Sequence, residues 1–308
     1  MGAARNALLW ISENRKLREA LPRYRFIRRA VSRFMPGEKL EDAIAGADRL
    51  KGQSIGTVFT HLGENVSDAA EAKNVADDYV EMLRQIKKSG LDTHVSVKLT
   101  HLGLDLDQSL CLENLRTVVK EAETSGTMVW IDMEQSSYVD RTLAMFRAIR
   151  KDHRNVGLCL QAYLYRTEKD LNDLLPLSPA IRFVKGAYKE PAAIAFAKKS
   201  DVDANFFKLS KMLLGQSSKG ARLVAGTHDM NLIRSVQDEA GRIAVSKSEY
   251  EFHLLYGIQT QEQLRLAREG FSVRVLISYG SFWFPWYVRR LAERPANVWF
   301  VVRKMFSS

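Results

Sequence analysis

Short apolar runs that alternate with longer helical segments are the feature that most limits the fold of this chain. Runs rich in β-branched residues recur at 54–60, 94–100, 128–133, 156–162, 181–185, 222–227, 250–254 and 271–277. Segments with helical periodicity separate them, among them 69–88, 110–124, 138–151, 169–175 and 206–214. Eight strands with intervening helices over about 250 residues match a (β/α)8 barrel, whereas a doubly wound sheet usually has fewer strands. We therefore predict an α/β fold of the TIM-like (β/α)8 type, in which 250–254 is the least regular strand.

The first part of the chain has a different pattern. Between residues 13 and 34, arginines and lysines are dense and apolar residues recur at helical intervals, which predicts a basic amphipathic helical region. Pro36-Gly37 interrupts it, and 40–51 is expected to form a further short helix. We predict a basic N-terminal helical extension at 1–52 and a catalytic barrel at 53–308. The basic stripe has two interpretations, a solvated helix face or a surface that docks on an anionic membrane.

Composition restricts the compartment and the partners. The chain has 46 Lys and Arg against 36 Asp and Glu, a formal net charge of +10, which favours anionic partners without choosing among them. Cys111 and Cys159 are its two cysteines, so a disulfide framework is excluded and a reducing compartment is indicated. No apolar stretch approaches the roughly 20 residues of a membrane span. We expect a cytoplasmic protein, either free or at the inner face of the membrane.

Several common cofactor and metal motifs are absent from the sequence. No strand is followed by G-x-G-x-x-G, and no Walker A sequence occurs, so a conventional dinucleotide or ATP site is not expected. The six histidines do not fall into zinc-ligand spacings, so we predict no metal site.

Polar residues stand at the carboxyl ends of the predicted strands. In a (β/α)8 barrel these ends meet at one mouth, where the reaction site is built from several strands. Lys98 lies within an apolar run, and Asp132 directly follows one. Each charge needs an opposite charge nearby to offset the cost of desolvation. They are therefore either part of a lined pocket or a buried ion pair. The later strands extend the pattern with Gln161, Arg182, Lys185, Thr227 and His228.

A second candidate site follows the last predicted strand. On a helix, Trp286, Arg289, Arg290 and Glu293 fall at i, i+3, i+4 and i+7, so that one face carries a ring, two guanidinium groups and an acid. Adjacent arginines on a helix are commonly solvated. The functional alternative is bidentate binding of a carboxylate, for which guanidinium geometry is suited.

Seven collinear motifs resemble the flavin-dependent proline dehydrogenases. They are SVKLT at 96–100, IDME at 131–134, QAY at 161–163, RFVKGAY at 182–188, GTHD at 226–229, EFHLLYG at 251–257 and RRLAE at 289–293. Each motif alone is weak, but they occur in order along nearly the whole predicted barrel. The resemblance implies a distorted (β/α)8 barrel that binds FAD non-covalently, oxidises L-proline to 1-pyrroline-5-carboxylate by hydride transfer to flavin N5, and passes electrons to a membrane quinone.

The resemblance also implies residue roles. Arg289 and Arg290 correspond to the arginines that hold the substrate carboxylate, and Lys98 with Asp132 corresponds to the lysine and aspartate on the substrate side. Arg182 corresponds to the arginine near flavin N5. Residues that correspond to cofactor contacts are Met133, Gln161, Lys185, Gly186, Ala187, Lys199, Thr227 and His228. Donors near N1 and N5 suit a flavin because negative charge develops there on reduction.

The chain departs from the family pattern where the substrate ring is expected. Trp286 and Leu276 stand where the family usually has tyrosines, so two hydroxyl groups are missing from the pocket. The preferred substrate is L-proline or a close cyclic amino acid. The alternatives are a modified proline with oxygen as acceptor, or a catalytically silent barrel that acts as a binding module. We expect no nucleic-acid partner.

Overall fold

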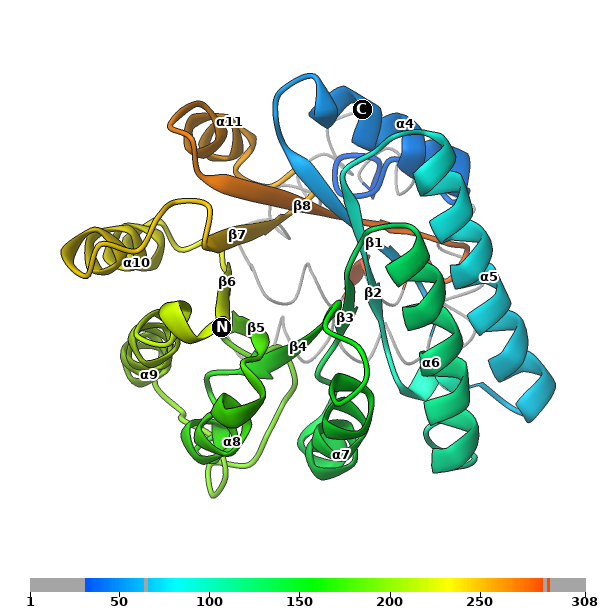
Figure 1. Ribbon diagram of the computed structural model, residues 1–308, viewed down its shortest axis with the longest axis horizontal. Coiled ribbons are helices and arrows are strands. Elements are labelled where there is room, and N and C mark those ends of the chain that lie inside the picture. Colours follow the sequence, from blue (N-terminus) through cyan, green and yellow to red (C-terminus); the bar gives the residue numbers. More distant parts are fainter. Residues whose placement is uncertain (1–30, 64–65, 285–286, 289–308) are drawn as a thin grey trace, which may run out of the picture.

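Eight parallel strands close into a barrel, with helices around it (Figure 1). The computed structural model describes residues 31–63, 66–284 and 287–288. The strands are β1 (Gly56–His61), β2 (Thr93–Val97), β3 (Val129–Ile131), β4 (Val156–Gln161), β5 (Ala180–Val184), β6 (Arg222–Gly226), β7 (Tyr250–Leu255) and β8 (Ser272–Tyr279). Each strand pairs in parallel with the next, and β8 closes the barrel on β1. The predicted fold class and all eight predicted strands are confirmed.

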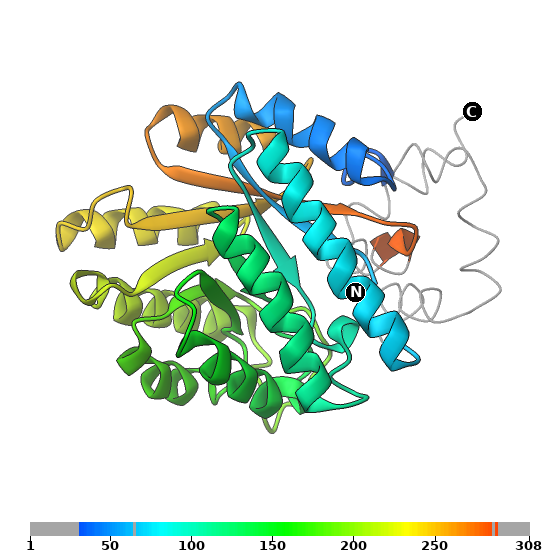
Figure 2. The same ribbon diagram turned by 45° about the vertical axis from the view of Figure 1, so that its right-hand side comes forward.

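Helices cover the outer face of the barrel on all sides (Figures 1 and 2). The α-helices are α4 (Leu40–Lys51), α5 (Ala69–Lys88), α6 (Gln108–Thr124), α7 (Val139–Arg150), α8 (Thr167–Leu174), α9 (Lys199–Leu214), α10 (Met230–Arg242) and α11 (Thr260–Arg268). Single 3-10 turns lie at Thr100–Leu102, Ser136–Tyr138, Leu175–Leu177 and Ser217–Lys219. Asp68, Asp107 and Asp229 cap the amino ends of α5, α6 and α10 through their carboxylates, which satisfies backbone N–H groups of the first turn.

Several elements differ in length from the prediction, and the differences at β3 and α9 have a local cause. Strand β3 ends at Ile131, two residues before the predicted end, because Met133 and Glu134 leave the ladder and bond to neighbouring segments. Helix α9 begins at Lys199, seven residues before the predicted start, because its polar first turns carry no apolar periodicity that would reveal them.

Apolar side chains divide between the two faces of the barrel. The larger cluster fills the space between the strands and the helices, where Phe59, Phe183 and Phe252 are fully buried. A smaller cluster lies inside the barrel, formed by Val58, Met128, Trp130, Ala180, Val224 and Leu276. This division follows from the alternation of side chains along each strand. It places Leu276 on the inner face.

Helix α4 packs against the barrel beside β1 and β8 (Figure 1). Its Ala43 and Ala47 belong to the larger apolar cluster, and a Cβ atom at Gly46 would lie 3.5 Å from Ile277 of β8. The domain boundary near Gly52 stays a prediction, and residues 1–30 of the predicted extension lie outside the described residues. Within the described ranges, no helix combines the length and the apolar character needed to cross a membrane.

Candidate active site at the carboxyl end of the barrel

The predicted site residues gather at one end of the barrel. Lys98 follows β2, Asp132 and Met133 follow β3, Gln161 ends β4, and Arg182 lies on the inner face of β5. Lys185, Gly186 and Ala187 follow β5, whereas Thr227 and His228 follow β6. Because all strands are parallel, these positions share the carboxyl-terminal mouth, as in other barrels of this type.

Arg182 is the centre of a buried polar group at this mouth. The residue is 3% exposed, and its guanidinium pairs with the Asp132 carboxylate. Its Nη2 also donates to Ser96 Oγ at 3.0 Å, and the Ser96 hydroxyl donates to Asp132 Oδ1 at 2.9 Å. Burial is the largest single influence and opposes the charged form of Arg182, but the Asp132 carboxylate and the Cys159 side chain together hold the arginine's pKa above its usual value. The ion-pair interpretation of the sequence named Lys98 as the partner of Asp132, and the structure shows that the Asp132 carboxylate pairs with Arg182.

Lys98 and Leu276 lie on either side of β1. Lys98 is half-buried at the end of β2, and Leu276 is half-buried on β8, packed against the inner cluster that contains Val58 and Trp130. Leu276 pairs in register with Val58, so its side chain points into the barrel. This position agrees with the predicted contact between Leu276 and a substrate ring, which stays a prediction.

A second group at the mouth surrounds the end of β4. Gln161 is 2% exposed, and its Nε2 donates to the Met133 carbonyl at 3.3 Å. Gly186 has φ of +119°, and a Cβ atom there would lie 2.3 Å from the ring of Tyr163. Glycine is therefore required by both backbone conformation and space. Tyr163 stood in the QAY motif but received no predicted role, because its contact with Gly186 is set only by the fold.

A charged cluster lies between β5, α9 and α10. Lys185 Nζ lies 2.5 Å from Asp203 Oδ1 and 2.7 Å from Asp229 Oδ2, and Lys199 contacts the same two carboxylates. Although burial opposes its charge, Asp229 receives hydrogen bonds from both lysines, which hold its pKa well below its usual value. The two aspartates were absent from the predicted site. Asp229 stood in the GTHD motif, and its spacing gave no sign of contact with Lys185.

Thr227 and His228 are fixed by backbone groups. The Thr227 hydroxyl accepts from the Asp229 N–H at 3.1 Å, and His228 Nε2 accepts from the Leu255 N–H at 2.9 Å. Because Nε2 is an acceptor, the neutral ring of His228 carries its proton on Nδ1. Thr227 is thus held by the backbone at the start of α10, and His228 by β7.

The residues predicted to bind the substrate carboxylate follow β8 in the chain. Trp286, Arg289 and Arg290 lie outside the described residues. Their described neighbour Tyr287 is buried, with its ring centroid 6.1 Å from that of Phe34. The segment just before them is anchored by Trp283, whose Nε1 donates to Glu38 at 2.9 Å.

The donor set at the mouth fits a flavin. Gln161 Oε1 and Arg182 Nη1 are buried and have no hydrogen-bond partner within the described part of the chain. One is an acceptor and the other a donor, and the pyrimidine edge of an isoalloxazine presents both kinds of partner. Lys185 and Lys199 offer cations for a diphosphate, but Asp203 and Asp229 already neutralise them, so an anion must share these lysines with the acids.

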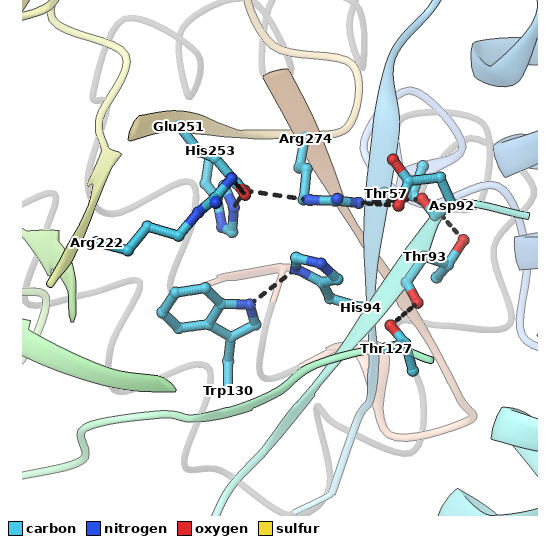
Figure 3. A network of polar contacts seen from close by, with 10 residues as sticks. All are labelled: Thr57, Asp92, Thr93, His94, Thr127, Trp130, Arg222, Glu251, His253 and Arg274. Carbon is cyan, nitrogen blue, oxygen red and sulfur yellow. Dashed lines mark hydrogen bonds and ion pairs between the residues drawn. The ribbon is translucent and has the colours of Figure 1, made fainter. Parts of the chain in front are cut away.

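A separate polar network occupies the amino-terminal end of the barrel (Figure 3). Glu251 accepts from Arg222 at 2.5 Å, from Arg274 at 3.1 Å and pairs with His253 Nε2 at 2.9 Å. Burial lowers the pKa of His253 to about 4, although Glu251 opposes this shift. His94, Glu251 and His253 have a ligand-like spacing. Two arginines already neutralise the single carboxylate, so a divalent cation would bring uncompensated charge into the interior.

Comparison with known proteins assigns the family. The family model described as proline dehydrogenase matches residues 43–303. Proline dehydrogenase 2 of Bacillus subtilis is 38% identical over 276 residues, which cover 90% of each chain. Proline dehydrogenase of Deinococcus radiodurans is 36% identical over 306 residues, which cover 98% of this chain and 97% of that protein.

Solved structures agree on the fold. Proline utilization A (PutA) from Bdellovibrio bacteriovorus, inactivated by N-propargylglycine, superposes with a TM-score of 0.81 at 21% identity over 92% of this chain. The match spans 37% of that longer protein. With the collinear motifs, the barrel and the close relatives in agreement, the chain belongs to the proline dehydrogenase family of oxidoreductases.

Proposed function

We propose that this protein binds FAD non-covalently and oxidises L-proline to 1-pyrroline-5-carboxylate. The observation that carries the proposal is Arg182, a buried cation at the mouth of the barrel with one nitrogen that has no hydrogen-bond partner among the described residues. A buried charge is costly, and the pairing with Asp132 offsets that cost while one donor remains for a ligand. Such a donor suits a ring that gains negative charge on reduction.

The proposed roles of the other residues follow from their positions. Gln161 and Met133 contact the ring system, whereas Lys185, Gly186, Ala187, Lys199, Thr227 and His228 lie along the remainder of the cofactor. Because Gly186 has no side chain, its backbone can lie close to the Tyr163 ring. The Ser96 hydroxyl donates to Asp132 and so fixes the orientation of that carboxylate. FAD, when bound, supplies the acceptor for the hydride and returns the electrons to a second acceptor.

Substrate binding requires both ends of proline to be held. Arg289 and Arg290 are proposed to hold the carboxylate by charge-assisted hydrogen bonds, and Lys98 with Asp132 to order the opposite side of the pocket. Asp132 already binds Arg182, so it connects the substrate side to the cofactor side through one carboxylate. The pocket thereby fixes the carbon that loses hydride relative to its acceptor.

Anaerobic reduction tests cofactor and reaction together. The purified protein should be yellow, and acid precipitation should release the flavin into the supernatant. Addition of L-proline without oxygen should bleach the flavin absorbance, and D-proline should not. A colourless protein that FAD does not reconstitute, or a bound flavin that no cyclic amino acid bleaches, would contradict the proposal.

A modified proline is the second candidate substrate. Leu276 presents an apolar side chain on the inner face, which favours an unmodified or alkyl-bearing ring over a hydroxylated one. Ser278, two residues further on the same strand, has a buried hydroxyl without a partner in the described ranges. A hydroxyl group on the substrate ring would need a hydrogen-bond partner such as the Ser278 hydroxyl. Turnover of proline, 4-hydroxyproline and a methylated proline therefore separates the candidates.

The electron acceptor is proposed to be a membrane quinone, which the enzyme reaches by peripheral contact at the inner face. The support is the basic stripe at 13–34, in which each Lys or Arg near an anionic surface contributes about 1 kcal/mol. Sedimentation with anionic vesicles, but not with neutral ones, and its decline with salt are expected. Equal recovery in the supernatant for both lipids would assign the stripe to a solvated helix face.

A further inference from the structure

Trp130 lies inside the barrel, directly beneath the site. It is the central residue of β3, is fully buried, and points toward the barrel axis. A Cβ atom at Gly157 of the neighbouring strand would lie 2.4 Å from Trp130 Cζ3. Because Gly157 has no side chain, the indole of Trp130 can occupy the space above it.

The indole is held in place from the amino-terminal side. Trp130 Nε1 donates to His94 Nδ1 at 3.1 Å, as Figure 3 shows. Burial holds the pKa of His94 well below its usual value, so the ring is neutral and can accept. His253 meets the indole edge-on, with centroids 5.4 Å apart, and is itself paired with Glu251. The ring of Trp130 thus has a fixed tilt.

The opposite side of the indole contacts the site. The Arg182 Cζ atom lies 5.3 Å from the centroid of the Trp130 ring, within the range of a cation–π contact. Asp132 and Ser96 hold the guanidinium through Nη2 alone. The Cys159 side chain on the neighbouring strand also interacts with the guanidinium, and the indole face restricts its tilt about Nη2.

We propose that Trp130 is a positioning residue, which sets the height and tilt of the Arg182 guanidinium and is itself fixed by Gly157, His94 and His253. This inference rests on the proposed placement of Arg182 beside the flavin. A displacement of about 1 Å at a reacting group can cost roughly a hundredfold in rate, so support from behind the site matters for turnover. Substrate affinity depends on other groups and should change little.

The test compares three variants. Trp130→Leu removes the supporting face, Trp130→Phe retains a smaller face without the Nε1 donor, and Phe206→Leu removes a fully buried ring on α9 that contacts Phe183 outside the barrel. The measurements are kcat and KM for proline, the dissociation constant of FAD, and the midpoint potential of the bound flavin. Thermal unfolding of each variant measures the loss of stability separately from the effect on catalysis.

We expect Trp130→Leu to lower kcat by about ten- to hundredfold. KM and the FAD dissociation constant should stay within about threefold, and the flavin potential should become more negative because a displaced cation stabilises the reduced ring less. The kcat and the flavin potential of Trp130→Phe should lie between those of Trp130→Leu and those of the wild type. Phe206→Leu should also lose stability, because it removes a buried ring, but it should retain wild-type kcat and potential.

The outcomes that would overturn the inference differ from those that would refute the proposed function. Equal losses of kcat in Trp130→Leu and Phe206→Leu, or an unchanged potential in Trp130→Leu, would overturn the positioning role. Should Trp130→Leu not fold, Trp130→Phe decides, and wild-type kcat and potential in that variant would overturn the proposal. A wild-type protein that binds no flavin, or that no cyclic amino acid reduces, would instead refute the proposed function on which the inference rests.

Discussion

Replacement of Asp132 by asparagine is the sharpest test of the buried charge at the mouth. Asparagine keeps the size of the side chain but removes the negative charge, which leaves the guanidinium of Arg182 without an ionic partner in the barrel interior. Removal of one partner of a buried ion pair costs about 3–5 kcal/mol. The side chain of Asp132 is 23% exposed and Ser96 still accepts from Arg182, so we expect the lower end, about 3 kcal/mol.

Urea unfolding measures this loss in the protein saturated with FAD and in the protein freed of it. Asp140→Asn is the matched control, because Asp140 pairs with Arg166 through a carboxylate that is 81% exposed. Exposed pairs contribute about 1 kcal/mol or less. The midpoint of unfolding should therefore shift strongly for Asp132→Asn and little for Asp140→Asn. Equal shifts for the two variants would refute the reasoning, since they would mean that the charge of Arg182 does not depend on Asp132.

Three further predictions concern the substrate pocket and the barrel interior. Arg289→Ala and Arg290→Ala should leave FAD bound and lower kcat/KM for proline about ten- to hundredfold, because each removes a charge-assisted hydrogen bond to the carboxylate; unchanged kinetics would mean that both arginines are solvated. Leu276→Tyr should narrow the tolerance for methylated proline relative to proline, since tyrosine fills more of the pocket; a wild-type enzyme that oxidises 4-hydroxyproline as well as proline would contradict the apolar pocket. The pKa of His253 is lowered to about 4 by burial, below its unfolded value of 6.5, so the unfolded chain binds the proton that the native state excludes and stability falls as pH decreases from 6.5 toward 4. His253→Gln should reduce this slope in urea unfolding between these pH values, and an unaltered slope would show that another group is responsible.

The strands could be located from sequence because the signal for them is local. A short apolar run bounded by polar residues marks a strand wherever it lies in the chain, and even the irregular run at 250–254 corresponds to β7. The same holds for α5, whose apolar periodicity runs over the whole helix from Ala69 to Lys88. Helix α9 shows the limit, since its first turn carries Lys199, which pairs with Asp203 and Asp229, and lacks an apolar stripe.

The sequence by itself also determined which residues stand at strand ends, and therefore that Asp132, Gln161 and Arg182 share one mouth. Only the tertiary structure decided that Asp132 pairs with Arg182, that Lys185 lies between Asp203 and Asp229, and that Trp130 lies beneath the site. The physical reason is the closure of the barrel. Side-chain direction along a strand alternates with a local period of two, whereas the neighbour across the barrel depends on stagger and tilt, which arise from the pairing of all eight strands.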